Sequence, residues 1–176
     1  MKIIGFIYRD GRAEMVLKGD SCLLNGRKPF FVPEWSQEIG VTDCMILRVS
    51  RLGKEIAPKF ASRYCDAIAP GEDFIALDKA RELAAAGKPW TPSIAFDYSL
   101  AIGEWISNDK MSATTLLNDE LILSPEEAIA EASKVMTIRQ GDLIYIQAKQ
   151  APRLVQKEEI LRVEIDGEEK LYCKIK

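Results

Sequence analysis

The hydrophobic pattern of the chain predicts a β-rich fold with few helices. Two apolar, β-prone runs near the start are separated by Asp10-Gly11, a pair typical of a tight hairpin turn. Asp166-Gly167 separates a second pair of such runs near the end. The predicted strands cover residues 2–8, 13–17, 43–50, 143–148, 159–165 and 170–175, and a further strand carries Asp73.

Three segments carry helical signals. Residues 124–127 (Ser-Pro-Glu-Glu) combine an N-cap serine, a proline at the first helical position and a glutamate that completes a capping box. Asp78 is expected to cap a second, short helix, which Gly87 and Pro89 would end. A helical turn is expected over residues 58–64. The sequence therefore predicts two or three short helices.

The length and composition fit one globular domain. A chain of 176 residues, with 47% hydrophobic and 29% charged residues, can bury a core of its own. We therefore expect a single α+β domain over residues 1–176, within which 112–123 fits either a strand or a loop. No apolar run approaches the length of a membrane span, and the N-terminus lacks a signal-peptide core. A cytoplasmic protein without a membrane partner is expected.

The net charge and the absence of histidine limit the partners and the kinds of reaction that the chain can serve. The formal charge of −3, from 24 Lys+Arg and 27 Asp+Glu, argues against nucleic acid as a partner. The four cysteines are scattered without a CxxC pair, which predicts buried thiols rather than a disulfide framework. The chain has no histidine. It therefore lacks the side chain best suited to proton transfer at neutral pH, which is also the commonest metal ligand.

The candidate site residues each fit a structural as well as a functional role. Asp73 fits either a metal ligand or a buried carboxylate satisfied by backbone N–H groups or a nearby cation. Asp78 fits a helix cap better than a catalytic acid. Cys44 could be a nucleophile, but no histidine exists to take its proton, so a buried thiol is the simpler interpretation. Tyr8, Trp90, Phe96 and Trp105 could line a ligand pocket, although aromatic residues of a β-rich fold belong first to the core.

A series of short motifs in a fixed order resembles the fumarylacetoacetate hydrolase family, in particular its short bacterial branch. Residues 73–78 (Asp-Phe-Ile-Ala-Leu-Asp) are similar to the family's D-x-[ST]-A-R-D motif. The other matching positions are Lys-Pro-Phe-Phe-Val-Pro at 28–33, Gly-Lys at 53–54, Gly-Lys-Pro-Trp at 87–90, Ala-Phe-Asp at 95–97, Ile-Gly at 102–103 and Gly-Asp-Leu-Ile at 141–144. The resemblance implies the fold of the family's C-terminal domain, mixed β-sheets rolled into a barrel or sandwich. It also implies a homodimer.

The resemblance implies a metal site whose ligands are largely absent here. Family members cleave, decarboxylate or isomerise β-dicarbonyl and acylpyruvate-type acids, using a Mg²⁺- or Ca²⁺-like ion held by a Glu-x-Glu strand and the first Asp of the D-x-[ST]-A-R-D motif. The two glutamate positions are Thr42 and Cys44 in this chain, so Asp73 is the single remaining ligand. A hydroxyl and a thiol suit a hard cation poorly. No cofactor is therefore expected, or Mg²⁺ or Ca²⁺ if the site is partly retained.

Other positions that carry the family's chemistry are replaced as well. Gly11 stands at the histidine of N-Y-x-x-H, Ile94 at the lysine of K-x-F-D and Leu77 at the arginine of A-R-D, and residues 147–151 replace the G-T-P-x-G loop. Loss of one member of a catalytic unit can cost as much as loss of the whole unit. The sequence thus predicts no catalytic residue and a vestigial pocket formed by Tyr8, Thr42, Cys44, Asp73, Asp78 and Ile94.

Three functions are compatible with this pattern. The leading hypothesis is a pseudoenzyme that binds a small carboxylic acid or serves in assembly. The first alternative is an active hydrolase, isomerase or decarboxylase with a rearranged site, for example one using Asp73, Cys44 and a carboxylate of a partner chain. The second is a structural partner of an active paralogue.

Overall fold

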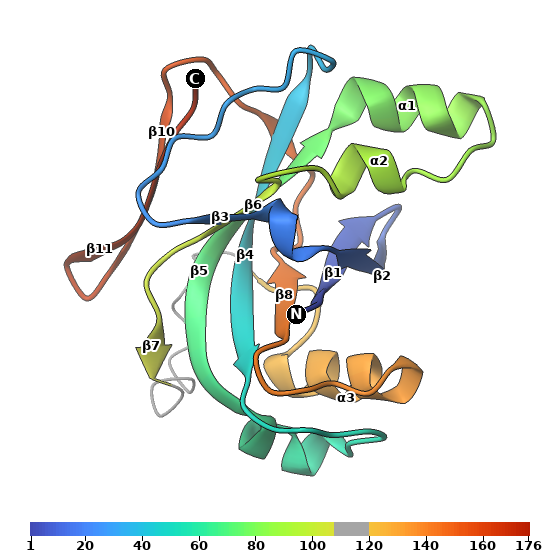
Figure 1. Ribbon diagram of the computed structural model, residues 1–176, viewed down its shortest axis with the longest axis vertical. Helices are drawn as coiled ribbons and strands as arrows, with labels where there is room; N and C mark the ends of the chain where they lie inside the picture. The colour runs from blue at the N-terminus through green and yellow to red at the C-terminus, as the bar shows by residue number, and fades with distance from the viewer. Residues whose placement is uncertain (108–119) are drawn as a thin grey trace.

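The computed structural model describes residues 1–107 and 120–176, and it consists of one large sheet with helices and a hairpin packed on its faces (Figure 1). The strands are β1 (Ile3–Arg9), β2 (Arg12–Lys18), β3 (Leu23–Asn25), β4 (Ile39–Val49), β5 (Cys65–Ala76), β6 (Leu100–Ile102), β7 (Ile106–Ser107), β8 (Leu143–Gln147), β9 (Arg153–Leu154), β10 (Ile160–Ile165) and β11 (Glu168–Lys174). The helices are α1 (Leu77–Ala85), α2 (Thr91–Ile94), α3 (Pro125–Val135) and the 3₁₀ segments η1 (Asp20–Cys22) and η2 (Pro58–Tyr64). The predicted β-rich α+β fold is confirmed.

The large sheet is mixed and open. Its strand order is β2-β1-β8-β4-β5-β6-β3, with β7 paired to β5 and β9 paired to β4. The β1–β8 and β3–β6 pairs are parallel, and β10 and β11 form a separate hairpin. Because the path ends at β2 and β3, the described strands do not close on themselves. The barrel form of the prediction is therefore wrong, and a layered arrangement takes its place.

Strand alternation divides the core between the two faces of the sheet. One face packs against α3 and η2 at one end and against the β10–β11 hairpin at the other (Figure 1). The opposite face carries α1 and α2 and buries a smaller cluster that includes Ile46, Ile94 and Tyr145. On β5 the odd-numbered residues, Asp73 among them, face α1 and α2, since Thr42, Cys44 and Ile46 pair with Asp73, Gly71 and Ala69. This alternation sets where the candidate site lies.

Several local predictions are confirmed. Asp10 and Gly11 adopt φ values of 49° and 79° and join β1 to β2, as expected for the hairpin turn. The Ser124 hydroxyl accepts a hydrogen bond from the backbone N–H of Glu127, whose carboxylate accepts one from the backbone N–H of Ser124, so α3 begins with the predicted capping box. Of the ambiguous stretch 112–123, residues 112–119 lie outside the described part of the chain.

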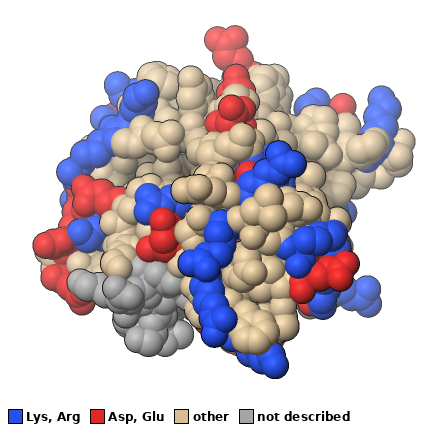
Figure 2. Space-filling model, turned by 60° about the horizontal axis from the view of Figure 1, so that its bottom comes forward, with Lys and Arg blue, Asp and Glu red and all other residues tan. Residues whose placement is uncertain are grey.

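The surface is locally basic in spite of the net charge of −3. Lys and Arg side chains gather on the face of the molecule turned forward in Figure 2, the lower end in Figure 1 where η2 and α3 lie. The cations of Lys59 and Arg63 each lie 5.0 Å from the ring centroid of Phe60, and that of Arg51 lies 5.9 Å from the ring of Tyr64.

No helix in the described ranges has the length and apolar character needed to span a membrane.

Candidate functional site

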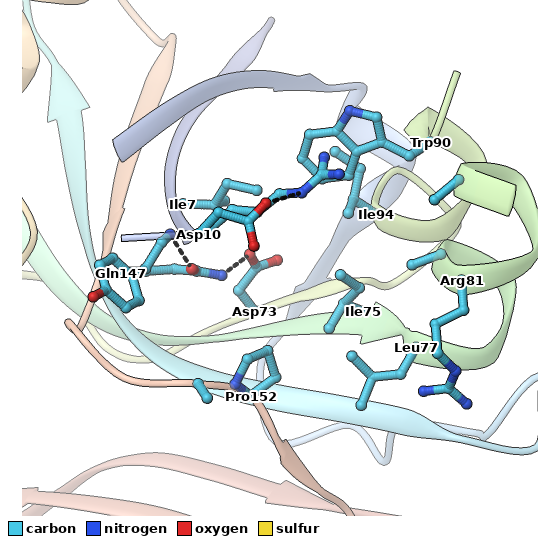
Figure 3. A pocket seen from close by; sticks show the side chains of 15 residues that line it. Ile7, Asp10, Asp73, Ile75, Leu77, Arg81, Trp90, Ile94, Gln147 and Pro152 are labelled. Carbon is cyan, nitrogen blue, oxygen red and sulfur yellow. Dashed lines mark hydrogen bonds and ion pairs between the residues drawn. The ribbon is translucent and has the colours of Figure 1, made fainter. Parts of the chain in front are cut away.

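A cavity of about 420 Å³ opens on the sheet face covered by α1 and α2 (Figure 3). Its walls are mainly apolar and come from Ile7 of β1, Ile75 of β5, Leu77 of α1, Ile94 of α2 and Trp90. Figure 3 shows Asp73 and Gln147 together in the floor, joined by a hydrogen bond. The cavity is therefore an apolar pocket over a small polar floor, the usual form of a small-molecule site.

Both oxygens of the Asp73 carboxylate are engaged by protein groups. Lys18 Nζ lies 2.6 Å from Oδ1, and Gln147 Nε2 donates a hydrogen bond of 2.7 Å to Oδ2. Gln147 Oε1 in turn accepts a hydrogen bond of 2.8 Å from the backbone N–H of Tyr8. The floor is thus a chain of contacts that ties β2, β5, β8 and β1 together at one point.

Lys18, the last residue of β2, is the residue that sequence reasoning missed. Its side chain is 0% exposed, and Nζ donates hydrogen bonds of 2.9 Å to both the backbone oxygen and the hydroxyl of Ser99. With Asp73 as its ion-pair partner, the ammonium is surrounded by three oxygens, of which the two of Ser99 accept hydrogen bonds from it. One signal could have found it, because strand alternation puts Lys18 on the same inward face as the buried Val16.

Thr42 and Cys44 lie beside Asp73 but do not line the cavity. They sit on β4, where Thr42 pairs with Asp73 and Cys44 pairs with Gly71, and their exposed fractions are 1% and 0%. Burial and then the nearby Asp73 carboxylate raise the pKa of the Cys44 thiol well above its usual value. Cys44 is therefore a protonated, buried thiol, and the interpretation of it as a nucleophile loses its basis.

Two buried hydroxyls near Asp73 are left without partners among the described residues. These are Thr42 Oγ1 and the phenol of Tyr145, a ring that also lies 5.7 Å from Lys18 Nζ. Burial and the Asp73 charge raise the pKa of Tyr145 well above its usual value, so the phenol stays protonated. The inner side of the site thus holds neutral donors around a single ion pair.

These residues do not fit a divalent metal ion. A hard cation needs several oxygen ligands, usually including more than one carboxylate. Thr42 and Cys44 supply a neutral hydroxyl and a thiol, and the Lys18 ammonium already contacts Asp73 and repels a second cation. Within residues 1–107 and 120–176, no three His, Cys, Asp or Glu side chains come together in a way that could hold a metal. Asp73 follows the second of its two predicted alternatives, a buried carboxylate satisfied by a nearby cation.

Asp78 has a different role from the one predicted. α1 begins at Leu77 with Ala76 at the N-cap position, so Asp78 lies inside the first turn and does not cap the helix. Its carboxylate does accept a hydrogen bond of 2.8 Å from a first-turn N–H, that of Lys79, and it also accepts from the Ser36 hydroxyl at 2.7 Å and from the Gln37 backbone N–H at 2.8 Å. Burial acts to raise its pKa, but these hydrogen bonds outweigh it and hold the pKa below the usual value. Asp78 fastens a loop to α1 and is not among the residues that line the cavity.

The other predicted positions divide between cavity and core. Tyr8, Ile94 and Trp90 line the cavity, as does Leu77 at the family's arginine position. Phe96, by contrast, belongs to an aromatic cluster with Phe30 and Trp35, and Trp105 lies on the surface under Arg48. The cavity therefore brings together three of the six predicted pocket residues, Tyr8, Asp73 and Ile94.

The charged residues that line the cavity are two cations and two anions, and each has a partner within the chain. Arg9 stacks its guanidinium 4.5 Å from the ring of Trp90 and forms only long ion pairs, of 3.7 Å, with Asp10 and Glu14. Arg81, labelled in Figure 3, pairs with Glu38 at 2.8 Å. Arg9 is therefore the cavity cation whose ion pairs within the described residues are longest.

Solved structures share this fold at low sequence identity. A putative fumarylpyruvate hydrolase from Burkholderia cenocepacia matches with a TM-score of 0.82 and 14% identity, over 99% of this chain and 88% of its own. A fumarylpyruvate hydrolase from Pseudomonas aeruginosa in complex with Mn²⁺ and pyruvate matches with a TM-score of 0.80 and 16% identity, over 99% of this chain and 88% of its own. A putative isomerase from Escherichia coli matches with a TM-score of 0.79 and 16% identity, over 99% of this chain and 91% of its own. At these identities the likeness establishes the fold alone.

The family itself is established by sequence. A search of curated proteins finds no match. The family model described as "Fumarylacetoacetate (FAA) hydrolase C-terminal" matches residues 9–176, which is nearly the whole chain and includes the Asp73 floor and the cavity walls except Ile7 and Tyr8. The resemblance inferred from the ordered motifs is thereby confirmed, and the chain belongs to the fumarylacetoacetate hydrolase family.

Proposed function

We propose that this family member binds a small carboxylic acid in its cavity and has lost the metal-dependent chemistry on C–C bonds. The observation that carries the proposal is the donor set next to Asp73. Thr42 and Cys44, neutral and fully buried, stand where the resemblance places two metal-binding glutamates. Without those carboxylates, no carboxylate on this face of β4 offsets the dehydration of a hard cation, since Asp43 pairs with Glu72 on the opposite face.

The retained cavity supports binding rather than a purely structural role. A volume of about 420 Å³ is of the size of known small-molecule pockets, and its walls are still apolar. Arg9 supplies a guanidinium whose own ion pairs are 3.7 Å long, whereas Arg81 is paired with Glu38 at 2.8 Å and Lys18 neutralises Asp73. An acid with one carboxylate and a short carbon chain matches this combination of charge and apolar surface.

The binding half of the proposal is tested with pyruvate, the acid in the P. aeruginosa complex. Isothermal titration and thermal shift of the purified chain, with EDTA present, should show saturable binding that is unchanged by added Mn²⁺. Arg9→Met should weaken binding by about tenfold or more, because it removes a charge-assisted hydrogen bond donor. Arg12→Met, at the outer end of the same hairpin, is the matched control. No saturable binding of pyruvate would favour the assembly alternatives.

The chemical half is tested by turnover. Acylpyruvate cleavage and oxaloacetate decarboxylation, followed spectroscopically with Mn²⁺ or Mg²⁺ added, should not exceed the protein-free rate. Asp73→Asn serves as the control, because a rate that belongs to this chain would fall on that substitution while a contaminant's rate would not. A metal-dependent rate abolished by Asp73→Asn would contradict the proposal and favour an active enzyme with a rearranged site.

A further inference from the structure

We propose that the Lys18 ammonium stands in the place of the divalent cation at Asp73, so that the site carries a cation of its own. The inference deepens the proposed function and rests on its claim that the metal site is lost. Lys18 is a positioning residue in this account, because its buried side chain does not reach the cavity.

The surroundings of Lys18 Nζ are those of a cation site. Three oxygens from two separate segments converge on it at 2.6 to 2.9 Å, namely Asp73 Oδ1 and the two Ser99 oxygens. The Ser99 hydroxyl donates its own proton to the Ile94 backbone oxygen at 3.0 Å, so its lone pair is free to face Lys18. A lysine on an edge strand has no need of such a cradle, since its ammonium can extend into water. The complete burial of the Lys18 side chain therefore indicates that its positive charge is required beside Asp73.

Charge balance links Lys18 to the substitutions on β4. In the pattern implied by the family resemblance, three carboxylates surround one divalent ion. Here Thr42 and Cys44 remove two negative charges, and one ammonium then neutralises the one remaining carboxylate, Asp73. Either change alone would leave unbalanced buried charge, which is costly. Lys18, Thr42 and Cys44 together therefore leave the buried site electrically neutral, and a bound divalent ion would add an unbalanced positive charge.

The consequence for the cavity is a floor that stays assembled without metal. Lys18 holds one oxygen of Asp73, which leaves the other to accept from Gln147, and Gln147 fixes the backbone of Tyr8 at the cavity. Loss of the ammonium should therefore disturb both the stability of the fold and the position of these lining residues. Supplying another cation should reverse the disturbance.

Chemical rescue tests the inference on the intact chain. Lys18→Ala should lower the thermal midpoint, and millimolar n-propylammonium, which replaces the lost ammonium, should raise it again by several degrees. Mn²⁺ should raise it less, because one carboxylate beside a hydroxyl and a thiol holds a hard cation weakly. Wild type and the double variant Lys18→Ala/Asp73→Asn should not respond, because the first holds its own cation and the second has no carboxylate to bind one. Lys157→Ala, an exposed lysine substitution, controls for nonspecific effects. A wild-type response to Mn²⁺, or no response of Lys18→Ala to either cation, would overturn the inference.

A double-mutant cycle decides the question if Lys18→Ala does not fold. In urea titrations, Lys18→Met should raise the equilibrium constant for unfolding by roughly 100-fold or more, because it leaves Asp73 buried and unpaired. Adding Asp73→Asn should recover most of that loss. Additive effects of the two substitutions would overturn the inference. None of these measurements uses a cavity ligand, so failure to bind pyruvate would reject the proposed function while leaving the Lys18 result to be judged separately.

Discussion

Glu72 offers a sharp test of the energetics on the sheet face opposite the cavity. It pairs with Asp43 across β5 and β4, its side chain is 3% exposed, and Oε2 has no hydrogen-bond partner among the described residues. Burial, and then the negative charge of Asp43 and a hydrogen bond with it, raise the pKa of Glu72 well above its usual value. The folded chain thus favours the protonated form.

The direction of the pH dependence follows from this shift. The unfolded carboxyl titrates near pH 4.3, at about its usual pKa. The contribution of Glu72 to stability is therefore complete below that value and is lost as the pH rises through the higher folded pKa. Glu72→Gln keeps the shape of the side chain and removes the titration. We expect it to stabilise the protein at pH 8 by about 1–3 kcal/mol, because the unfolded carboxyl is ionised at that pH while the folded one is buried beside Asp43, a cost that glutamine does not carry.

The measurement is the thermal midpoint at pH 5 and pH 8. For a chain of this size, 1 kcal/mol corresponds to a shift of about 2–4 °C. Glu72→Gln should melt higher than wild type at pH 8, and the difference should shrink at pH 5. Glu34→Gln, at an exposed glutamate, should show neither effect. If the Glu72→Gln variant were less stable than wild type at pH 8, or if its thermal midpoint differed from that of wild type by the same amount at both pH values, the folded chain would not favour the protonated form of Glu72.

Three further substitutions test the local structure. Gly5→Ala should destabilise by about 1–3 kcal/mol in urea titrations, because a Cβ at Gly5 would lie 2.2 Å from atoms of the Tyr145 ring; Gly19→Ala, with open space at that position, should be tolerated. Ser124→Ala should cost about 1 kcal/mol by the same method through loss of the α3 capping box, and Ser124→Thr should retain most of it. Asp78→Ala should increase proteolysis or hydrogen exchange around Gln37 without changing pyruvate affinity, and a loss of affinity would return Asp78 to the site.

Local signals were sufficient for much of the fold. The hairpin at Asp10-Gly11 and the helix after Ser124 depend on backbone conformation and hydrogen bonds within a few residues, so the sequence alone predicts them. Asp78 shows the limit of that approach. The N–H of Leu77 donates to the Glu38 backbone oxygen at 2.8 Å, and the Asp78 carboxylate accepts from Ser36 and Gln37 as well as from the neighbouring Lys79. Glu38, Ser36 and Gln37 are all distant in sequence from α1, so local signals could not place them.

The site was predictable in outline but not in its electrostatics. The ordered motifs identified Asp73 and the replaced glutamate positions, and the possibility that a nearby cation satisfies Asp73 was open from the start. The identity of that cation was harder to predict, because Lys18 is 55 positions from Asp73 and strand alternation indicates only that it faces inward with Val16, not which carboxylate it meets. The contact between Lys18 and Asp73 depends on the strand order of the sheet, in which β1, β8 and β4 lie between β2 and β5. That order comes from long-range pairing, which the sequence does not reveal. The open sheet was likewise set by long-range pairing.

Electron paramagnetic resonance of free Mn²⁺ during titration with wild-type protein tests whether Lys18, and not a divalent ion, balances the charge of Asp73 in this member of the fumarylacetoacetate hydrolase family. We expect the aqueous Mn²⁺ signal to fall no more than it does with the Asp73→Asn variant. Binding of one Mn²⁺ per chain by wild type, lost in Asp73→Asn, would show that a divalent ion occupies the site instead.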